Sequence, residues 1–337
     1  DNGVQNIVWA LDNNVNRTTN TRVIGGGWGE ITFMDGLTFK TQAGLDIANV
    51  RDYMYWDTES GDGYGYGGLI EEVNSTYATW NWQNVLNFTR TFNSVHNLTA
   101  TAVQEYTHSE TEYMDGSVYE LSDPFFSEHI ISNTFGQKDV GGWKSENGLA
   151  SYMFRANYNY DSKYYIGASI RYDGLSKLPK DTRWGTFWGA SAAWRLSREK
   201  FWTEAPVNEW FNDLRLRASY ATIGNSALGS DYPYLGTYGA KLVGPMAGIA
   251  WNVMGNNNLK WETTETFDIG LDGALFNNRM TFEIAYWQKN SKDLVLRVPT
   301  PPTMGIPNNY YYDNIGKIKN SGFELTVGGT IINTKDW

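Results

Sequence analysis

The chain has 337 residues, among them 15 Trp, 22 Tyr, 15 Phe and 35 Gly, and its formal net charge is -10. It has no run of about 18 apolar residues, which excludes a transmembrane helix. The absence of cysteine excludes disulfides, thiolate nucleophiles and cysteine metal ligands. Because the charge balance is negative and no basic run is present, nucleic-acid binding is not expected.

About twelve segments in which apolar and polar residues alternate follow one another along the chain, and the clearest is at residues 151–172. There an alternating run ends at Tyr160, the turn Asp161-Ser162 follows, and the alternation restarts at Tyr164. Period-two alternation predicts strands with one apolar and one polar face. The pattern therefore predicts that the whole chain, residues 1–337, belongs to a single all-β domain.

The connections between these segments alternate in length. Short turns of Asn, Asp, Gly and Ser occur at Asp35-Gly36, Asn93-Ser94, Asp161-Ser162 and Asn277-Asn278. Long Gly-, Tyr- and Asn-rich stretches cover about 51–75, 108–147, 226–257 and 292–316. In an up-and-down sheet every short turn lies on one side and every long loop on the other, as in outer-membrane barrels. One connection on the short-turn side, residues 197–212, is longer, and we expect a helical turn at 199–204.

The length of the alternating segments separates two kinds of all-β fold. A soluble β-sandwich also hides one face, but its strands average about 5 or 6 residues, whereas these segments run to about 10, the length that crosses a membrane. The sequence therefore predicts a transmembrane antiparallel up-and-down β-barrel. Aromatic residues near the predicted strand ends suit interfacial girdles; they are Phe92, Tyr160, Tyr164, Trp194, Phe276 and Trp287.

Candidate binding residues are aromatic side chains in the long loops, because Trp and Tyr rings stack on sugar faces and pack against peptide side chains. Three clusters qualify, and the alternative is that their rings only pack against one another; the residues are Tyr53, Tyr55, Trp56, Tyr64, Tyr66, Tyr310, Tyr311 and Tyr312. Adjacent residues of a strand point to opposite faces. At most two of the last three tyrosines can therefore share a pocket.

No metal site or cofactor is expected, although one loop offers carboxylates at calcium-like intervals. Asp57, Glu59 and Asp62 precede Gly63, but the spacing is not that of an EF-hand and the distant Glu is missing. A solvated acidic loop is the alternative to a structural calcium site. The three histidines, His96, His108 and His129, lack the paired spacing of a zinc site or a catalytic base.

Residues 171–324 carry a series of short motifs in order. They are Arg171-Tyr172-Asp173-Gly174, Arg183-Trp184-Gly185-Thr186-Phe187, Ala193-Trp194-Arg195-Leu196-Ser197, Leu214-Arg215-Leu216-Arg217-Ala218-Ser219-Tyr220, Asn258-Leu259-Lys260-Trp261-Glu262, Phe276-Asn277-Asn278-Arg279 and Asn320-Ser321-Gly322-Phe323-Glu324. This series resembles the C-terminal barrel of SusC/RagA-like TonB-dependent transporters of Bacteroidota. Residues 1–150 are similar to that barrel in architecture only.

The resemblance implies a barrel of about 22 strands, of which this chain supplies about twelve, so we interpret it as an internal piece of a longer polypeptide. The N-terminal plug and the final strands of such proteins are not visible in it. The resemblance further implies import of oligosaccharides or peptides across the outer membrane of a Gram-negative bacterium. A SusD-like surface lipoprotein would act as a lid, and TonB-ExbB-ExbD would supply energy through the plug.

Two other functions remain open from the residues alone. A passive porin or structural surface barrel would show the same strand pattern without a plug. A soluble carbohydrate-binding or hydrolytic β-protein would use the aromatic content, but no convincing pair of catalytic carboxylates is present. We therefore expect a transporter and no enzymatic activity.

Overall fold

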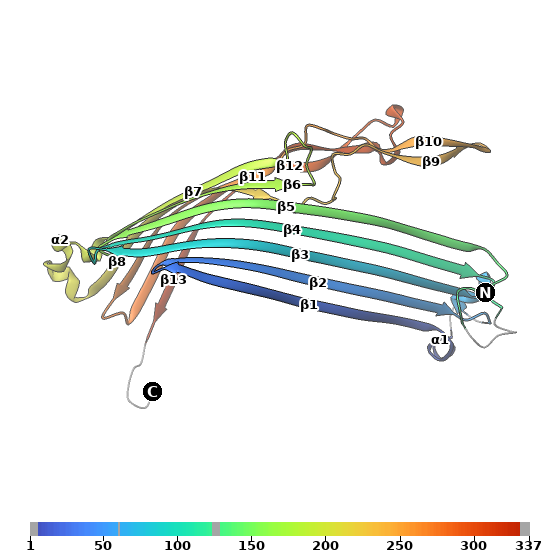
Figure 1. The fold of residues 1–337 in the computed structure, drawn as a ribbon, viewed down its shortest axis with the longest axis horizontal. Coiled ribbons are helices and arrows are strands. Elements are labelled where there is room, and N and C mark those ends of the chain that lie inside the picture. Colours follow the sequence, from blue (N-terminus) through green and yellow to red (C-terminus); the bar gives the residue numbers. More distant parts are fainter. Residues whose placement is uncertain (1–5, 60, 123–128, 331–337) are drawn as a thin grey trace. The chain divides into compact units, whose positions relative to one another are not determined.

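The computed structural model describes residues 6–59, 61–122 and 129–330. These residues form long strands, two short helices and several 3-10 turns (Figure 1). The helices and strands are α1 (Ile7–Asn13), β1 (Val15–Met34), β2 (Leu37–Trp56), β3 (Leu69–Phe92), β4 (His96–Tyr119), β5 (Lys138–Tyr160), β6 (Tyr164–Leu175), β7 (Trp184–Arg195), α2 (Lys200–Thr203), β8 (Phe211–Asn225), β9 (Thr237–Val243), β10 (Met246–Val253), β11 (Glu262–Leu275), β12 (Met280–Pro299) and β13 (Tyr310–Gly329). The 3-10 helices cover Gly61–Tyr66, Leu196–Arg198, Pro206–Glu209, Pro302–Met304 and Pro307–Asn309.

Eleven strands form one sheet in which neighbours in space are neighbours in sequence, except that β8 is followed by β11. The two strands between them, β9 and β10, form a separate antiparallel hairpin. The pairings of β5 with β6, β6 with β7 and β11 with β12 are antiparallel over 11 or more residue pairs each. The prediction of an up-and-down antiparallel sheet is therefore confirmed. None of the described helices combines the length and apolarity needed to cross a membrane.

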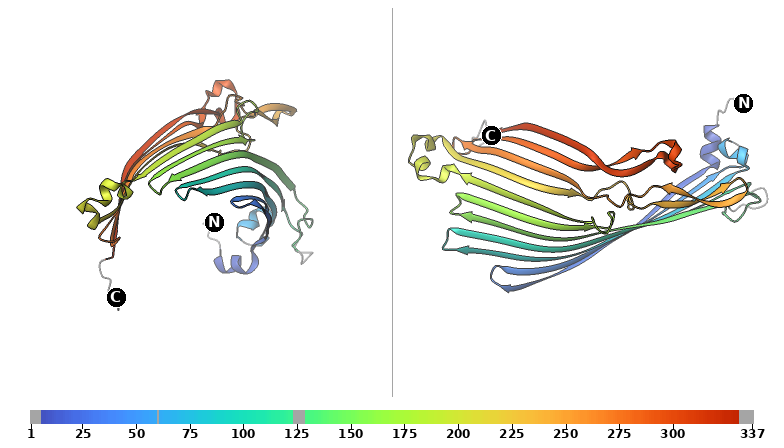
Figure 2. Two further views of the ribbon diagram at one scale, coloured as in Figure 1. Left: turned by 60° about the vertical axis from the view of Figure 1, so that its left-hand side comes forward. Right: turned by 90° about the horizontal axis from the view of Figure 1, so that it is seen from above.

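The chain divides into two compact units. The first contains residues 1–27, 42–82 and 107–147, and the second contains residues 28–41, 83–106 and 148–337. Within the second unit, β6, β7, β8, β11, β12 and β13 form a curved sheet (Figure 2).

All of the predicted short turns lie in the second unit. Asp161 and Ser162 have φ values of 51° and 54°, and Asn277 and Asn278 have 57° and 62°, which are the left-handed conformations that tight hairpins need. Neighbouring turns are joined, because Asp161 N donates to Val95 O at 2.7 Å. The longer connection contains α2, as expected for residues 199–204.

Three of the four predicted long loops are shorter than expected, whereas the one at 226–257 lies within the connection between β8 and β11. β4 continues to Tyr119 and β5 begins at Lys138, so most of the predicted loop at 108–147 is strand; residues 123–128 lie outside the described residues. The sequence of β4 past Thr107 is polar at odd and even positions alike. With polar residues on both faces the period-two signal disappears, although the backbone remains extended.

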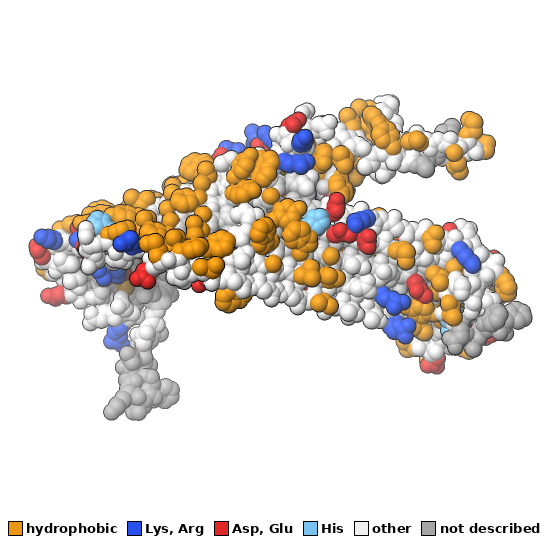
Figure 3. Space-filling view, viewed as in Figure 1, with side chains coloured by type: hydrophobic (Ala, Val, Ile, Leu, Met, Phe, Trp, Pro, Cys, Tyr) orange, Lys and Arg blue, Asp and Glu red, His pale blue; other side chains and the backbone are white. Residues whose placement is uncertain are grey.

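One face of the second unit is apolar and uncovered. Tyr152, Phe154, Ile166, Ile170 and Trp188 are each exposed by 50% or more. Figure 3 shows apolar side chains gathered over the sheet. A sandwich would bury such a face against a second sheet, so this face is suited to lipid.

One girdle prediction is wrong. Trp287 pairs directly with Asp268 across β11 and β12, and directly paired residues share a face of the sheet. Asp268 belongs to the polar face, where it binds Arg217. Trp287 therefore lies opposite the apolar face.

Candidate functional site

The polar face of the second unit carries a set of cross-strand ion pairs. Arg217 of β8 binds Asp268 and Asp272 of β11 and Glu283 of β12, with 3.2 Å between its Nε and Asp272 Oδ1. Arg215 binds Asp272 at 2.6 Å. These residues meet because strictly alternating positions on adjacent strands place their side chains on one face. Charges in such numbers require contact with water, so this face is suited to line an aqueous passage.

Arg195 and Asp213 extend these pairs toward the short turns. Arg195 Nε and Nη2 donate to the two carboxylate oxygens at 2.7 and 2.9 Å, and Ser197 Oγ donates to Oδ1. The bidentate geometry fixes both side chains. Beside them lies a cavity of about 500 Å³ that also borders Arg215, Arg217 and Glu283.

A second cavity, of about 320 Å³, lies on the same face near the other strand ends. Met153, Arg171, Asp173, Phe187 and Trp261 are among its lining residues. Arg171 Nε donates to both oxygens of Asp173, at 2.7 and 2.8 Å, and its Nη2 donates to Ser151 Oγ at 2.9 Å. The cavity thus combines apolar walls with a fixed, paired cation.

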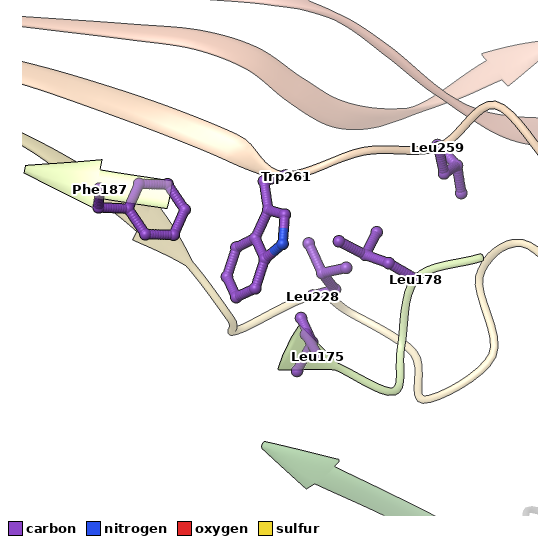
Figure 4. Close-up of a cluster of buried hydrophobic side chains, with 6 residues drawn as sticks. All are labelled: Leu175, Leu178, Phe187, Leu228, Leu259 and Trp261. Carbon is purple, nitrogen blue, oxygen red and sulfur yellow. The ribbon is translucent and has the colours of Figure 1, made fainter. Parts of the chain in front are cut away.

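A cluster of buried side chains from two loops and from the adjacent strands β6 and β7 adjoins this cavity (Figure 4). Trp261 packs edge-on against Phe187, with 5.3 Å between ring centroids, and its indole Nε1 donates to Arg183 O at 2.8 Å. Thr182 Oγ1 donates to Leu259 O. The members of this loop cluster are Leu175, Leu178, Phe187, Leu228, Leu259 and Trp261. It fixes the segment between β8 and β11 to the segment between β6 and β7.

Sequence reasoning did not find this loop cluster or its cavity as a site. The only signal was indirect, since Arg171, Asp173, Phe187 and Trp261 all belong to the motifs quoted for the family resemblance. Those motifs come from three separate stretches of the chain, and the fold brings them together around one cavity.

The first predicted aromatic cluster is mostly interior. Tyr55 is 4% exposed, stacks on His129 with 3.9 Å between ring centroids, and packs with Ile70 and Val118. Tyr53 donates its hydroxyl to His129 O at 2.9 Å. Trp56 ends β2 beside them, half-buried. Tyr55 is thus held by packing, whereas Tyr53 and His129 border a cavity of about 730 Å³, and cargo contact by this cluster stays a prediction.

Tyr64 and Tyr66 lie in the 3-10 helix at Gly61–Tyr66 and are exposed. Tyr66 also contacts Tyr119, with 5.6 Å between ring centroids. Their rings are open to solvent, and cargo contact by them stays a prediction.

The three candidate calcium ligands are not gathered. Asp57 is buried and accepts hydrogen bonds from Trp9 Nε1 at 2.8 Å and Glu59 N at 3.1 Å. Within residues 6–59, 61–122 and 129–330, one group of metal-type ligands converges, and it consists of His108, Glu110 and Glu146 instead. The ammonium of Lys144 lies 2.5 Å from Glu110.

The last cluster begins β13. Tyr310 and Tyr312 share a face, with 5.7 Å between ring centroids and the planes at 82°, and Arg297 lies over both rings. Tyr311, between them, forms a parallel backbone β-bridge with Met254. Cargo contact by these tyrosines stays a prediction.

Comparison with known proteins matches the whole chain to one family. Residues 1–337 fit the family described as TonB dependent receptor-like, beta-barrel. TonB-dependent receptor P39 of Formosa agariphila is 31% identical over 295 residues, which are 87% of this chain and 28% of that protein. TonB-dependent receptor SusC of Bacteroides thetaiotaomicron is 32% identical over 59% of this chain and 20% of its own length.

A solved structure of the RagAB peptide transporter superposes with a TM-score of 0.87 at 26% identity, covering 97% of this chain and 36% of that one. The chain therefore spans about a third, or less, of the length of each of these three proteins.

Proposed function

Because this chain belongs to the TonB-dependent receptor-like β-barrel family, we propose that it forms part of the wall of a transporter that imports oligosaccharides or peptides across the outer membrane. The family is one of receptors and transporters of the Gram-negative outer membrane rather than of enzymes. In this proposal energy reaches the cargo through TonB, acting on a plug, and no chemistry is done on the cargo.

The observation that carries the proposal is the contrast between the two faces of the sheet. On one face, large apolar side chains such as Ile166 and Phe154 are exposed by at least half of their surface. Arg217 and the carboxylates that it binds lie on the other face. Lipid against the first face and water against the second is the arrangement of a membrane barrel with a polar lumen.

The cargo class and the lid partner rest on similar proteins. The structural neighbour at 26% identity is the RagAB peptide transporter, and one relative in sequence is TonB-dependent receptor SusC. We propose a SusD-like lipoprotein as the partner on the outer surface and a cargo larger than porin solutes. The exposed loop tyrosines and the cavity beside Arg171 are the proposed contact points.

The test is uptake by cells that express the full-length protein, with and without TonB. Fluorescent oligosaccharides and peptides of mixed sequence serve as probes. Uptake is expected to stop when TonB is deleted and to return when it is restored. Uptake that continues unchanged without TonB would overturn the proposal in favour of a passive porin.

Purification tests the partner. A SusD-like lipoprotein, identified by mass spectrometry, is expected to remain bound to the full-length protein in detergent. If the protein is isolated from its native membrane without such a lipoprotein, the proposal of a lid partner fails, even where uptake depends on TonB.

A further inference from the structure

Arg297 holds a fixed place at the outer end of β12. Its Cζ lies 4.7 Å from the ring centroid of Tyr310 and 5.9 Å from that of Tyr312, and Arg297 pairs directly with Tyr312 across the two strands. Both distances are within the range of cation–π contact. Two rings therefore hold one guanidinium.

The segment that joins the two strands is stiff. It contains Pro301 and Pro302, whose φ angles are fixed by their rings. Thr300 N donates to Asn309 O at 2.7 Å, which closes the segment. The positions of Arg297 and the tyrosines are thus set by the backbone before any ligand arrives.

The face of the sheet on which this group lies is the polar one. Tyr312 and Val295 pack against the loop cluster that contains Phe187 and Trp261, beside the cavity lined by Arg171. Arg297 itself is exposed. Its guanidinium is therefore on the side of the wall where the proposed function places the cargo.

The positive charge of Arg297 is not matched by a carboxylate in the described part of the chain. The acidic groups nearby already have partners: Asp293 binds Lys260 at 3.1 Å, and Glu262 accepts from Asn225 Nδ2 and Val295 N, both at 2.6 Å. Asp313 accepts from Asn256 Nδ2 and Asn314 N. By contrast, Arg171, Arg195, Arg215 and Arg217 each bind at least one carboxylate.

Stacking on aromatic rings uses the flat faces of a guanidinium and leaves its in-plane N–H donors available. Of these donors only Nε has a partner among the described residues, the hydroxyl of Tyr312 at 3.4 Å, which is a long and weak contact. An oriented guanidinium with free edge donors matches the two oxygens of a carboxylate.

We propose that Arg297, oriented by Tyr310 and Tyr312, binds a carboxylate group of the cargo. The inference rests on the proposed function as an importer and adds a chemical class to it. A peptide C-terminus or acidic side chain and a uronic acid residue carry the same group, so the experiment contains an arm for each source.

Binding is measured on the purified full-length transporter in detergent, which does not require TonB. The peptide arm compares short peptides of mixed sequence with a free C-terminus against the same peptides as amides. The glycan arm compares a galacturonic acid trimer with a galactose trimer. In at least one arm the carboxylate probe is expected to bind about tenfold tighter, the size of one charge-assisted bidentate contact.

The variants separate charge from geometry. R297M is expected to abolish the preference for the carboxylate probe without changing binding of the neutral one, and R297K to keep only part of it because Lys cannot bind in bidentate fashion. R279M, which removes an exposed arginine at the β11–β12 turn, is the matched control and is expected to change nothing. Thermal unfolding of each variant verifies that the barrel is intact.

Three results overturn the inference: no preference in either arm, a preference that survives in R297M, or an equal loss in R279M. The arm that shows the preference identifies the source of the carboxylate. If uptake in cells depends on TonB but the binding preference is missing, the inference alone fails. If the preference is present but uptake ignores TonB, the proposed function fails instead.

Discussion

The indole Nε1 of Trp261 donates a hydrogen bond of 2.8 Å to the carbonyl oxygen of Arg183, 78 residues away in sequence. This bond joins the segment before β11 to the segment before β7. Both segments flank the cavity lined by Arg171 and Asp173, so the shape of that cavity depends on the bond and on the packing beneath it.

The first prediction concerns this connection. W261A removes a side chain that is 6% exposed. It is expected to lower the free energy of local unfolding of these loops by about 3–5 kcal/mol, the usual loss for a buried Trp. Because the loops rather than the sheet depend on it, we expect rapid protease cleavage within residues 226–260 of an otherwise folded barrel. W251A, in the exposed β9–β10 hairpin, is the control. Equal cleavage in both variants would contradict the role assigned to Trp261.

The second prediction concerns Arg217, which binds Asp268, Asp272 and Glu283. R217M leaves Asp268 and Glu283 without their cation, while Asp272 keeps only its contact with Arg215. Since the Arg217 side chain is 28% exposed, solvent screens part of the repulsion among these carboxylates, and we expect a loss of about 1–2 kcal/mol in unfolding free energy. Urea unfolding of the full-length protein in detergent measures it.

The matched control for Arg217 is Arg198, an exposed arginine in the 3-10 helix after β7. R198M is expected to leave the unfolding free energy unchanged. The double variant R217M/E283Q is expected to recover part of the loss, because it removes one of the repelling charges. No recovery would mean that Glu283 is not coupled to Arg217.

Much of the barrel wall could be predicted from sequence, because a strand with lipid on one face and water on the other alternates apolar and polar residues. Tyr152 and Tyr172 form a directly paired couple on the apolar face, as their even positions indicate, and Asp161-Ser162 makes the tight turn between their strands. The same rule failed past Thr107, where both faces are polar and the strand continues to Tyr119 without a periodic signal.

The site was harder to predict because loop packing has no period. Nothing in the sequence distinguishes Tyr55, which is buried on His129, from Tyr64, which is exposed. Likewise Leu228 and Leu259 meet Phe187 only through the folding of two loops onto each other. The pair Tyr310 and Tyr312 was predictable in its geometry because both belong to a strand, whereas the contact with Arg297 depends on register.

The third prediction concerns Gly36 in the β1–β2 turn. Its φ is +82°, and a Cβ atom there would lie 2.0 Å from the carbonyl oxygen of Thr89. G36A is therefore expected to destabilise the barrel by about 1–2 kcal/mol or more and to slow its assembly. G229A, at a glycine with nothing within 4 Å of its Cβ position, is expected to be neutral. The shift of SDS gels between heated and unheated samples reports folding of both.

The fourth prediction concerns pH and Glu199, which precedes α2. Hydrogen bonds from Tyr164 Oη at 2.5 Å and Trp194 Nε1 at 3.1 Å lower the pKa of Glu199 below its usual 4.5. A carboxyl whose pKa is lower in the folded state stabilises that state above the unfolded pKa, and this contribution is lost as pH falls through the folded value. The connection that contains α2 should thus loosen only below pH 4.5.

A spin label at E204C measures this loosening, since the chain has no cysteine of its own. Label mobility is expected to rise on acidification in the otherwise native protein. In E199Q, where no carboxylate titrates at this position, mobility should be independent of pH over the same window. A label at G229C, in the segment between β8 and β11, serves as the control and should not respond. If the rise in label mobility on acidification persists in E199Q, another titrating group causes the loosening and the prediction for Glu199 is wrong.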